Sequence, residues 1–147
     1  MTYFAVLDTN VLVSALLASR KLKDTPPLKV LRYMLNGTII PVYDDEIMAE
    51  YSEVLRRGKF AFPEEYINTL LEELAARGLK VERISAAAET FPDEDDRVFY
   101  EIAMSVDGSY LVTGNTRHFP ARPFVVTPAE MVEIIESSQW PDRNCPE

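Results

Sequence analysis

The stretch YFAVLDTN, residues 3–10, decides the fold of this chain. Its first five residues form a short apolar run that stops at Asp8, which is typical of a buried strand. Asn10 is expected to cap a helix, because the apolar residues that follow it recur at helical spacing. The stretch therefore predicts a strand that leads directly into a helix.

The rest of the chain repeats this alternation of strand and helix. Further strands are expected at residues 38–42, 79–84, 110–113 and 124–126. Further helices are expected at residues 26–36, 44–57, 63–78, 95–106 and 128–139, several of them bounded by Pro, Gly or a capping Asp. This order predicts a parallel sheet with helices on its faces, in which ligands bind beyond the carboxyl ends of the strands.

Length and composition indicate one globular domain. The 147 residues are 47% hydrophobic, without repeats or linkers, so we expect a single domain over residues 1–139 and a tail over 140–147. Cys145 is the only cysteine and the apolar N-terminus is interrupted by Asp8. A disulfide framework, a membrane span and secretion are therefore not expected, and we predict a cytoplasmic protein.

The charge of the chain is unevenly distributed. The formal net charge of −9 excludes a protein that coats nucleic acid through overall positive charge. Residues 1–59, however, carry 7 acidic and 8 basic residues, whereas residues 60–147 carry 17 acidic and 7 basic ones. The composition of residues 1–59 therefore still allows a local basic surface.

Carboxylates stand at three places where the predicted fold brings segments together. Asp8 ends the first strand, Glu50 lies beside the apolar stripe of its helix, and Asp93 and Asp96 belong to an acidic run before another helix. Asp95 is a less favoured member of the same run. Ordinary roles remain open for each: a helix cap, an ion pair, or an acid at the positive end of a helix dipole.

Carboxylates gathered at one place repel one another unless a cation lies between them. With oxygen ligands alone, the expected ion is Mg²⁺ or Mn²⁺. Such a centre suits hydrolysis of phosphodiesters by an activated water. The sequence has no glycine-rich phosphate loop, no GxSxG motif and no Cys–His pairing.

Taken together, the segments that carry these acids resemble the PIN-domain family. They are Asp8-Thr9-Asn10, AEYSEVLRRGKF with Glu50, DEDDRVFYEIA with Asp93 and Asp96, and YLVTGN ending at Asn115. The closest likeness is to bacterial PIN proteins that act as toxins of toxin–antitoxin pairs, which are VapC-like ribonucleases. The resemblance implies a three-layer α/β/α sandwich around a mostly parallel sheet, a homodimer, and RNA cleavage that depends on Mg²⁺ or Mn²⁺.

The resemblance also assigns roles to residues. It implies that Asp8, Glu50 and Asp96 are the catalytic, metal-binding acids, with Asp93 as an additional acid. Thr9, Asn10 and Thr113 match its supporting polar positions. Asn115 stands where the family most often has Asp, so the site is less negative by one charge and a second metal ion is less favoured.

Basic residues of the first part of the chain are candidates for contact with RNA phosphates. They are Arg20, Lys21, Lys23, Arg56, Arg57 and Lys59, for which solvated surface positions are the ordinary alternative. If the protein is a toxin, the family implies an antitoxin protein as partner. Two other functions remain open: a PIN-fold binding module weakened in catalysis by Asn115, and a magnesium-dependent phosphatase. Asn10 disfavours the phosphatase, because the aspartyl-phosphate type needs an Asp there.

Overall fold

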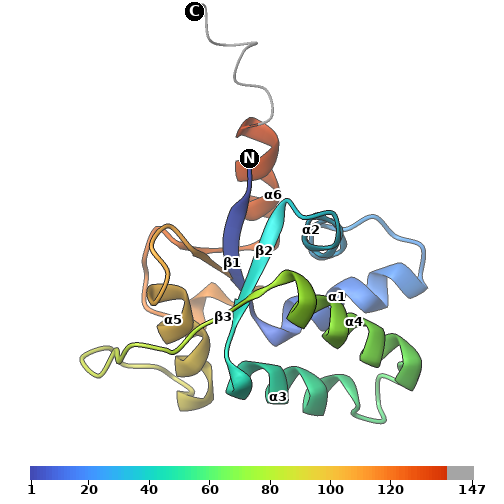
Figure 1. The fold of residues 1–147 in the computed structure, drawn as a ribbon, viewed down its shortest axis with the longest axis horizontal. Coiled ribbons are helices and arrows are strands. Elements are labelled where there is room, and N and C mark those ends of the chain that lie inside the picture. The colour runs from blue at the N-terminus through green and yellow to red at the C-terminus, as the bar shows by residue number, and fades with distance from the viewer. Residues whose placement is uncertain (139–147) are drawn as a thin grey trace, which may run out of the picture.

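The structure, a computed structural model, describes residues 1–138 and contains a five-stranded, all-parallel sheet in the order β3-β2-β1-β4-β5 (Figure 1). The strands are β1 (Tyr3–Leu7), β2 (Ile39–Tyr43), β3 (Leu79–Lys80), β4 (Tyr110–Val112) and β5 (Val125–Val126). The prediction of a parallel sheet is confirmed.

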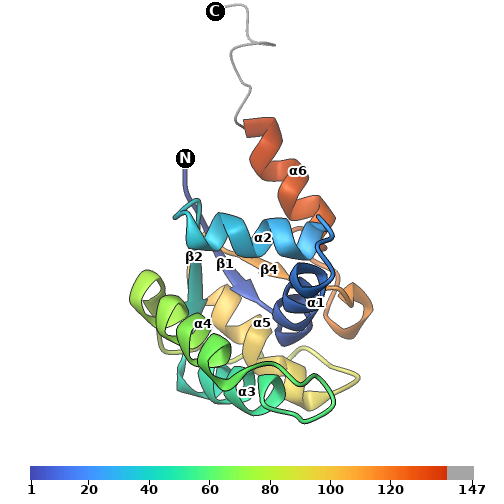
Figure 2. The same ribbon diagram turned by 90° about the vertical axis from the view of Figure 1, so that its right-hand side faces the viewer.

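Helices cover both faces of this sheet. They are α1 (Thr9–Arg20), α2 (Pro26–Leu35), α3 (Asp45–Leu55), α4 (Glu64–Arg77), α5 (Arg97–Met104) and α6 (Pro128–Ser138). Figures 1 and 2 show α5 on one face, and α1, α2 and α4 on the other. The arrangement is the three-layer α/β/α sandwich that the sequence predicted. No helix within residues 1–138 has the length and hydropathy of a membrane span.

The core lies around β1, the central strand. Ala5, Val6 and Leu7 are completely buried, as expected for a strand covered by helices on both faces. The phenol of Tyr51, on α3, donates a buried hydrogen bond of 2.5 Å to the backbone carbonyl of Leu7. This contact ties α3 to the carboxyl end of β1.

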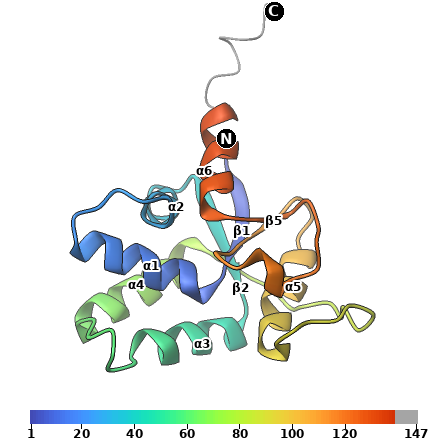
Figure 3. The ribbon, with the colours of Figure 1, turned by 180° about the vertical axis from the view of Figure 1, so that it is seen from behind.

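The order of the strands places a topological switch point between β1 and β4. The chain moves from β1 outward through β2 to β3, then crosses to β4 on the other side of β1 and continues outward to β5. Ligands of open parallel sheets bind outside the carboxyl ends of the strands at such a point. Figures 1 and 3 show α3 at that end of the molecule, whereas α6 lies at the opposite end, near the N-terminus.

Three predictions about these elements need correction. Helix α1 begins one residue after Asp8, which occupies the cap position, so Asn10 lies inside the helix. The side chain of Asn10 instead donates to Asp8 over 3.3 Å and accepts from the backbone N–H of Gly114 over 3.2 Å. Asn10 therefore joins the α1 terminus to the segment after β4. Asp44 caps α3 as predicted, accepting from the N–H of Ile47 over 2.9 Å.

The other two corrections concern residues 79–84 and 95–106. Strand β3 is only two residues long, because its partner β2 ends at Tyr43 and offers no further ladder. The predicted helix over 95–106 is a 3₁₀ turn (Glu94–Asp96) followed by α5, because Asp93 accepts from the N–H of Asp95 over 3.0 Å. Gln139 and the predicted tail over 140–147 lie outside the described residues.

Candidate active site

Asp8 lies at the switch point, buried with only 7% of its surface exposed. Its Oδ2 accepts a hydrogen bond of 2.7 Å from the hydroxyl of Thr113, which directly follows β4, and a longer one from Asn10. Burial raises the pKa of Asp8, and the hydrogen bond from Thr113 is the largest of the effects that oppose this rise. The carboxylate is thus held in one orientation by two neighbouring segments.

Glu50 faces Asp8 from the neighbouring helix. It lies on α3, half-buried, and its Oε2 accepts a hydrogen bond of 2.7 Å from the hydroxyl of Thr9, the first residue of α1. Burial, together with the negative charge of Asp8, raises the pKa of Glu50. Since Thr9 adjoins Asp8 in the chain, this hydrogen bond brings the second predicted acid to the carboxyl end of β1.

Asp96 approaches the same place from the start of α5. Its Oδ2 is buried and accepts no hydrogen bond from residues 1–138, although Nδ1 of His118 lies 3.5 Å away, within ion-pair distance if the imidazole is protonated. Burial, followed by the charges of Asp8 and Asp93, raises its pKa to about 6. A buried carboxylate oxygen without a partner is costly, and this one is available to a ligand.

These three side chains, Asp8, Glu50 and Asp96, form what we call the carboxylate cluster. The charge of Asp8 raises the pKa of both Glu50 and Asp96, although the chain segments that carry the three acids are far apart in sequence. Within residues 1–138, no three Asp, Glu, His or Cys side chains are gathered closely enough to ligate one ion as they stand.

The donors of the cluster fit a hard divalent cation. The cluster offers only oxygen atoms, and one of them, Oδ2 of Asp96, is buried and accepts no hydrogen bond from the residues that the structure describes. A hard cation such as Mg²⁺ keeps several of its waters and needs only one or two direct carboxylate contacts. Asp8, Glu50 and Asp96 are therefore the residues that would hold it.

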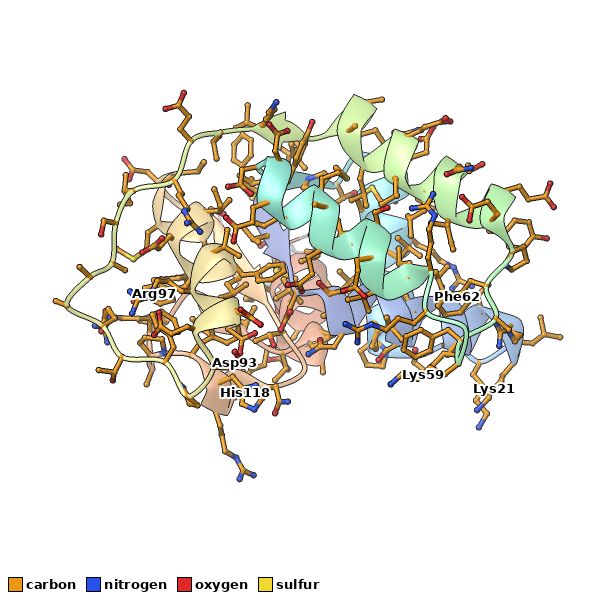
Figure 4. The ribbon with its side chains drawn as sticks, turned by 90° about the horizontal axis from the view of Figure 1, so that it is seen from below. Lys21, Lys59, Phe62, Asp93, Arg97 and His118 are labelled. Atoms are coloured by element: carbon orange, nitrogen blue, oxygen red, sulfur yellow. The ribbon has the colours of Figure 1, made fainter. Side chains whose placement is uncertain are left out.

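The remaining predicted polar residues lie around this cluster in different ways. Asp93 is exposed and its carboxylate is used to cap the 3₁₀ turn before α5. Thr113 is completely buried, and its hydroxyl both donates to Asp8 and accepts from the N–H of Asn115. Asn115 is exposed, and its side chain makes no capping hydrogen bond. Figure 4 shows Asp93 and His118 at the same end of the molecule.

The predicted basic residues fall into two groups. Arg56 forms an ion pair of 2.8 Å with Glu64, and Arg57 one of 3.0 Å with Glu53, so both support the helices that surround them. The other four belong to the end of α1 and the segment after α3. They are Arg20, Lys21, Lys23 and Lys59, all exposed.

Some contributors to the site were not singled out from the sequence. Tyr51 fixes α3 against β1, but its place in an apolar helical stripe indicated only a core residue. Arg97 donates to the carbonyls of Ala86 and Glu89, over 2.6 and 2.9 Å, and so attaches the segment before the acidic run to α5. No local pattern indicates contacts of this kind, because the acceptors are backbone atoms of an irregular segment.

Fold and cluster together define a class: a parallel α/β/α sandwich with acids at the switch point of its sheet. Comparison with family models gives a match to the PIN domain over residues 5–117, and the chain belongs to this family. PIN domains are a superfamily of nucleases that generally use divalent metal ions. Comparisons with curated proteins and with solved structures gave no match.

Proposed function

We propose that this PIN domain is an endoribonuclease that depends on Mg²⁺ or Mn²⁺, and that it is the toxin of a toxin–antitoxin pair. The observation that carries the proposal is the placement of Asp8, Glu50 and Asp96 around the switch point, with an Oδ2 of Asp96 that is buried and accepts no hydrogen bond from residues 1–138. Three acids placed at one end of a sheet, each with a pKa raised by burial, destabilise the fold when they ionise, which favours a role in chemistry.

The residues of the chain supply orientation in this proposal. Thr113 and Asn10 fix the Asp8 carboxylate, and Thr9 fixes that of Glu50, so that little reorganisation is needed on binding. When bound, a divalent cation supplies a Lewis acid for the phosphate and lowers the pKa of a water. Oδ2 of Asp96 accepts no hydrogen bond from residues 1–138, so it can take a ligand without breaking one.

A cleavage assay with purified protein tests the nuclease. A single-stranded RNA is incubated with the protein at increasing Mg²⁺ or Mn²⁺, with chelator, and with an Asp8→Asn variant whose fold is checked by circular dichroism. We expect cleavage that requires the ion and disappears in the variant. Cleavage that persists in chelator, or in Asp8→Asn, would contradict the proposal. Asp107→Asn, which removes one exposed acid elsewhere, is the matched control.

The toxin role has a test of its own. Induced expression in a bacterial host should arrest growth, Asp8→Asn should not, and coexpression of a short neighbouring reading frame that encodes the antitoxin should restore growth. We also propose that the protein forms a homodimer, and light scattering measures the mass of the species in solution. Unimpaired growth with an active purified enzyme would reject the toxin role and keep the nuclease.

A second candidate function rests on Asn115. An amide at this exposed position after β4 gives a neutral oxygen where the family most often has a carboxylate, which lowers the affinity for a cation. The alternative is a PIN-fold module that binds RNA or a protein with little turnover. RNA binding without cleavage at millimolar Mg²⁺ or Mn²⁺ would favour it over the nuclease.

A further inference from the structure

A pocket of about 450 Å³ lies between the end of α1 and the segment that joins α3 to α4. Two of its lining residues are aromatic, Phe62 and Tyr66, and a third is Arg20. Tyr66 is 63% exposed, so a face of its ring is open to a ligand that reaches the pocket. The pocket is separate from the carboxylate cluster, none of whose members lines it.

Aromatic rings and cations are interleaved around this pocket. Phe60 and Phe62 are stacked, with ring centroids 5.4 Å apart and planes inclined by 13°. The guanidinium of Arg20 lies 4.9 Å from the centre of the Phe62 ring, and the ammonium of Lys59 lies 5.2 Å from that of Phe60. Arg20, Phe62 and Tyr66 line the pocket, and Phe60 and Lys59 adjoin it through these contacts. We call these five residues the aromatic–basic pocket.

The geometry of this pocket is held by the backbone. Arg20 donates a hydrogen bond of 2.7 Å to the carbonyl of Phe60, which fixes the guanidinium plane beside the rings. Between the two phenylalanines, Ala61 has a positive φ of 53°, a strained backbone conformation that residues with a side chain rarely adopt. The stacked pair is therefore maintained against a local strain.

The charge around the pocket favours an anionic ligand. Lys21 directly follows Arg20, Lys23 lies two positions further along the chain, and both are exposed. Figure 4 shows Lys21, Lys59 and Phe62 together at one end of α3, away from Asp93 and His118. The protein as a whole has a net charge of −9, so this gathering of cations is not explained by composition.

One face of α1 connects the pocket with the carboxylate cluster. Four residues lie on this face at helical spacing: Thr9, Val13, Leu16 and Arg20. Thr9 donates a hydrogen bond to Glu50, whereas Leu16 and Arg20 line the pocket. At 1.5 Å per residue, Thr9 and Arg20 are about 17 Å apart along the helix. This length corresponds to about five stacked nucleotides at roughly 3.4 Å each.

We propose that the aromatic–basic pocket binds an unpaired base of a single-stranded RNA whose phosphodiester backbone extends along α1 to the carboxylate cluster. Sequence-tolerant binding of single strands combines aromatic side chains that stack on bases with cations that contact phosphates. Both components are present here within one pocket. The choice of RNA as ligand rests on the proposed function, whereas the location of the base-binding pocket rests on these contacts.

Fluorescence anisotropy with a labelled eight-nucleotide RNA in chelator tests this inference, because binding is then measured without cleavage. A base stacked on an aromatic side chain contributes about 1–3 kcal/mol, so Tyr66→Ala should weaken binding roughly 5- to 150-fold. An abasic oligomer of the same length should bind wild type and Tyr66→Ala equally. Leu35→Ala, another exposed apolar side chain, should leave the affinity for RNA unchanged.

Charge removal gives a second, independent readout. Lys59→Ala should weaken binding of the RNA and of the abasic oligomer alike, and should lower the slope of log affinity against log salt by about one. Arg77→Ala is the control: it removes one positive charge at the far end of α4, about 20 Å along the helix from Glu64 at its start. It should change neither the affinity for RNA nor the salt slope. Both Tyr66 and Lys59 are exposed, so their replacement preserves the fold.

The outcomes separate this inference from the proposed function. RNA affinity that is unchanged in both Tyr66→Ala and Lys59→Ala would overturn the inference even if the protein cleaves RNA. An equal loss of affinity of Tyr66→Ala for the RNA and for the abasic oligomer would also overturn it. Base-dependent binding by a protein that cleaves no RNA would support the pocket and reject the nuclease.

Discussion

The hydroxyl of Thr113 donates a hydrogen bond of 2.7 Å to Oδ2 of Asp8, and this contact joins the carboxyl ends of β4 and β1, the two strands at the switch point of the sheet. Both residues are buried, and Thr113 is not exposed at all. Burial disfavours the charged form of Asp8, and the hydroxyl partly compensates for this. Thr113 is therefore a positioning residue for an acid of the cluster.

Replacement of this hydroxyl should shift the pH dependence of the site. Thr113→Val removes the hydrogen bond that most lowers the pKa of Asp8, so this pKa should rise and ionisation should need a higher pH. We expect the acidic limb of the profile of RNA cleavage, and of Mg²⁺ affinity, to move to higher pH. Thr69→Val, on the exposed face of α4, is the matched control, and an identical profile in both variants would contradict the assigned role.

The pKa of Asp96 predicts how pH affects the stability of the metal-free protein. Its pKa of about 6 in the fold lies above the ordinary value of 3.8, so the folded state binds this proton more tightly than the unfolded one. Stability from this group is present below about pH 4 and is lost as the pH rises through about 6. Asp96→Asn should therefore raise the unfolding free energy at pH 7.5 by on the order of 1–3 kcal/mol.

Urea unfolding at several pH values measures this effect. The difference between Asp96→Asn and wild type should shrink as the pH falls toward 4, and added Mg²⁺ should stabilise wild type but not the variant. Asp107→Asn, an exposed position, provides the control for loss of one charge. A variant less stable than wild type at every pH would show that Asp96 has a structural role instead.

Addition of an acid at position 115 should strengthen metal binding. Asn115→Asp gives the exposed position after β4 the carboxylate that the family most often has there, and we expect Mg²⁺ affinity and any cleavage rate to rise by roughly tenfold, since a charged oxygen replaces a neutral one. Calorimetric titration measures the affinity. Asn36→Asp adds the same charge at an exposed turn, and equal behaviour of the two variants would show that residue 115 is not a ligand.

Arg97 should control the order of the segment before the acidic run. Its guanidinium donates to two backbone carbonyls and lies 4.6 Å from the centre of the Phe91 ring, contacts that Arg97→Met would remove. We expect faster hydrogen exchange over residues 84–93 and a loss of about 1–3 kcal/mol of stability. In Arg77→Met, which breaks only a surface pair with Glu73, exchange over that segment should stay as in wild type.

Much of the fold could be predicted because its signals are local. The apolar run that stops at Asp8 and the cap at Asp44 each depend on neighbouring residues, and both elements appear where expected. Strand β3 was predicted too long because its length depends on where β2 ends, which is a property of the sheet and not of residues 79–84. The break before α5 depends on the side chain of Asp93, which caps the 3₁₀ turn. The sequence alone does not distinguish this capping role from that of an additional metal-binding acid.

The site could be predicted in part for a similar reason. Acids at strand ends are visible in the sequence, but Thr113 reaches Asp8 across 105 positions of the chain, a contact that only the strand order creates. The stacking of Phe60 and Phe62 depends on the positive φ of Ala61, for which the sequence gives no indication.

Titration with Mn²⁺, followed by electron paramagnetic resonance and calorimetry, tests most directly whether the carboxylate cluster is a metal centre. We predict saturable binding by wild type, and a loss of at least tenfold in affinity in each of Asp8→Asn, Glu50→Gln and Asp96→Asn, with Asp107→Asn unchanged. Equal Mn²⁺ affinity in wild type and all three variants of the cluster would contradict the account.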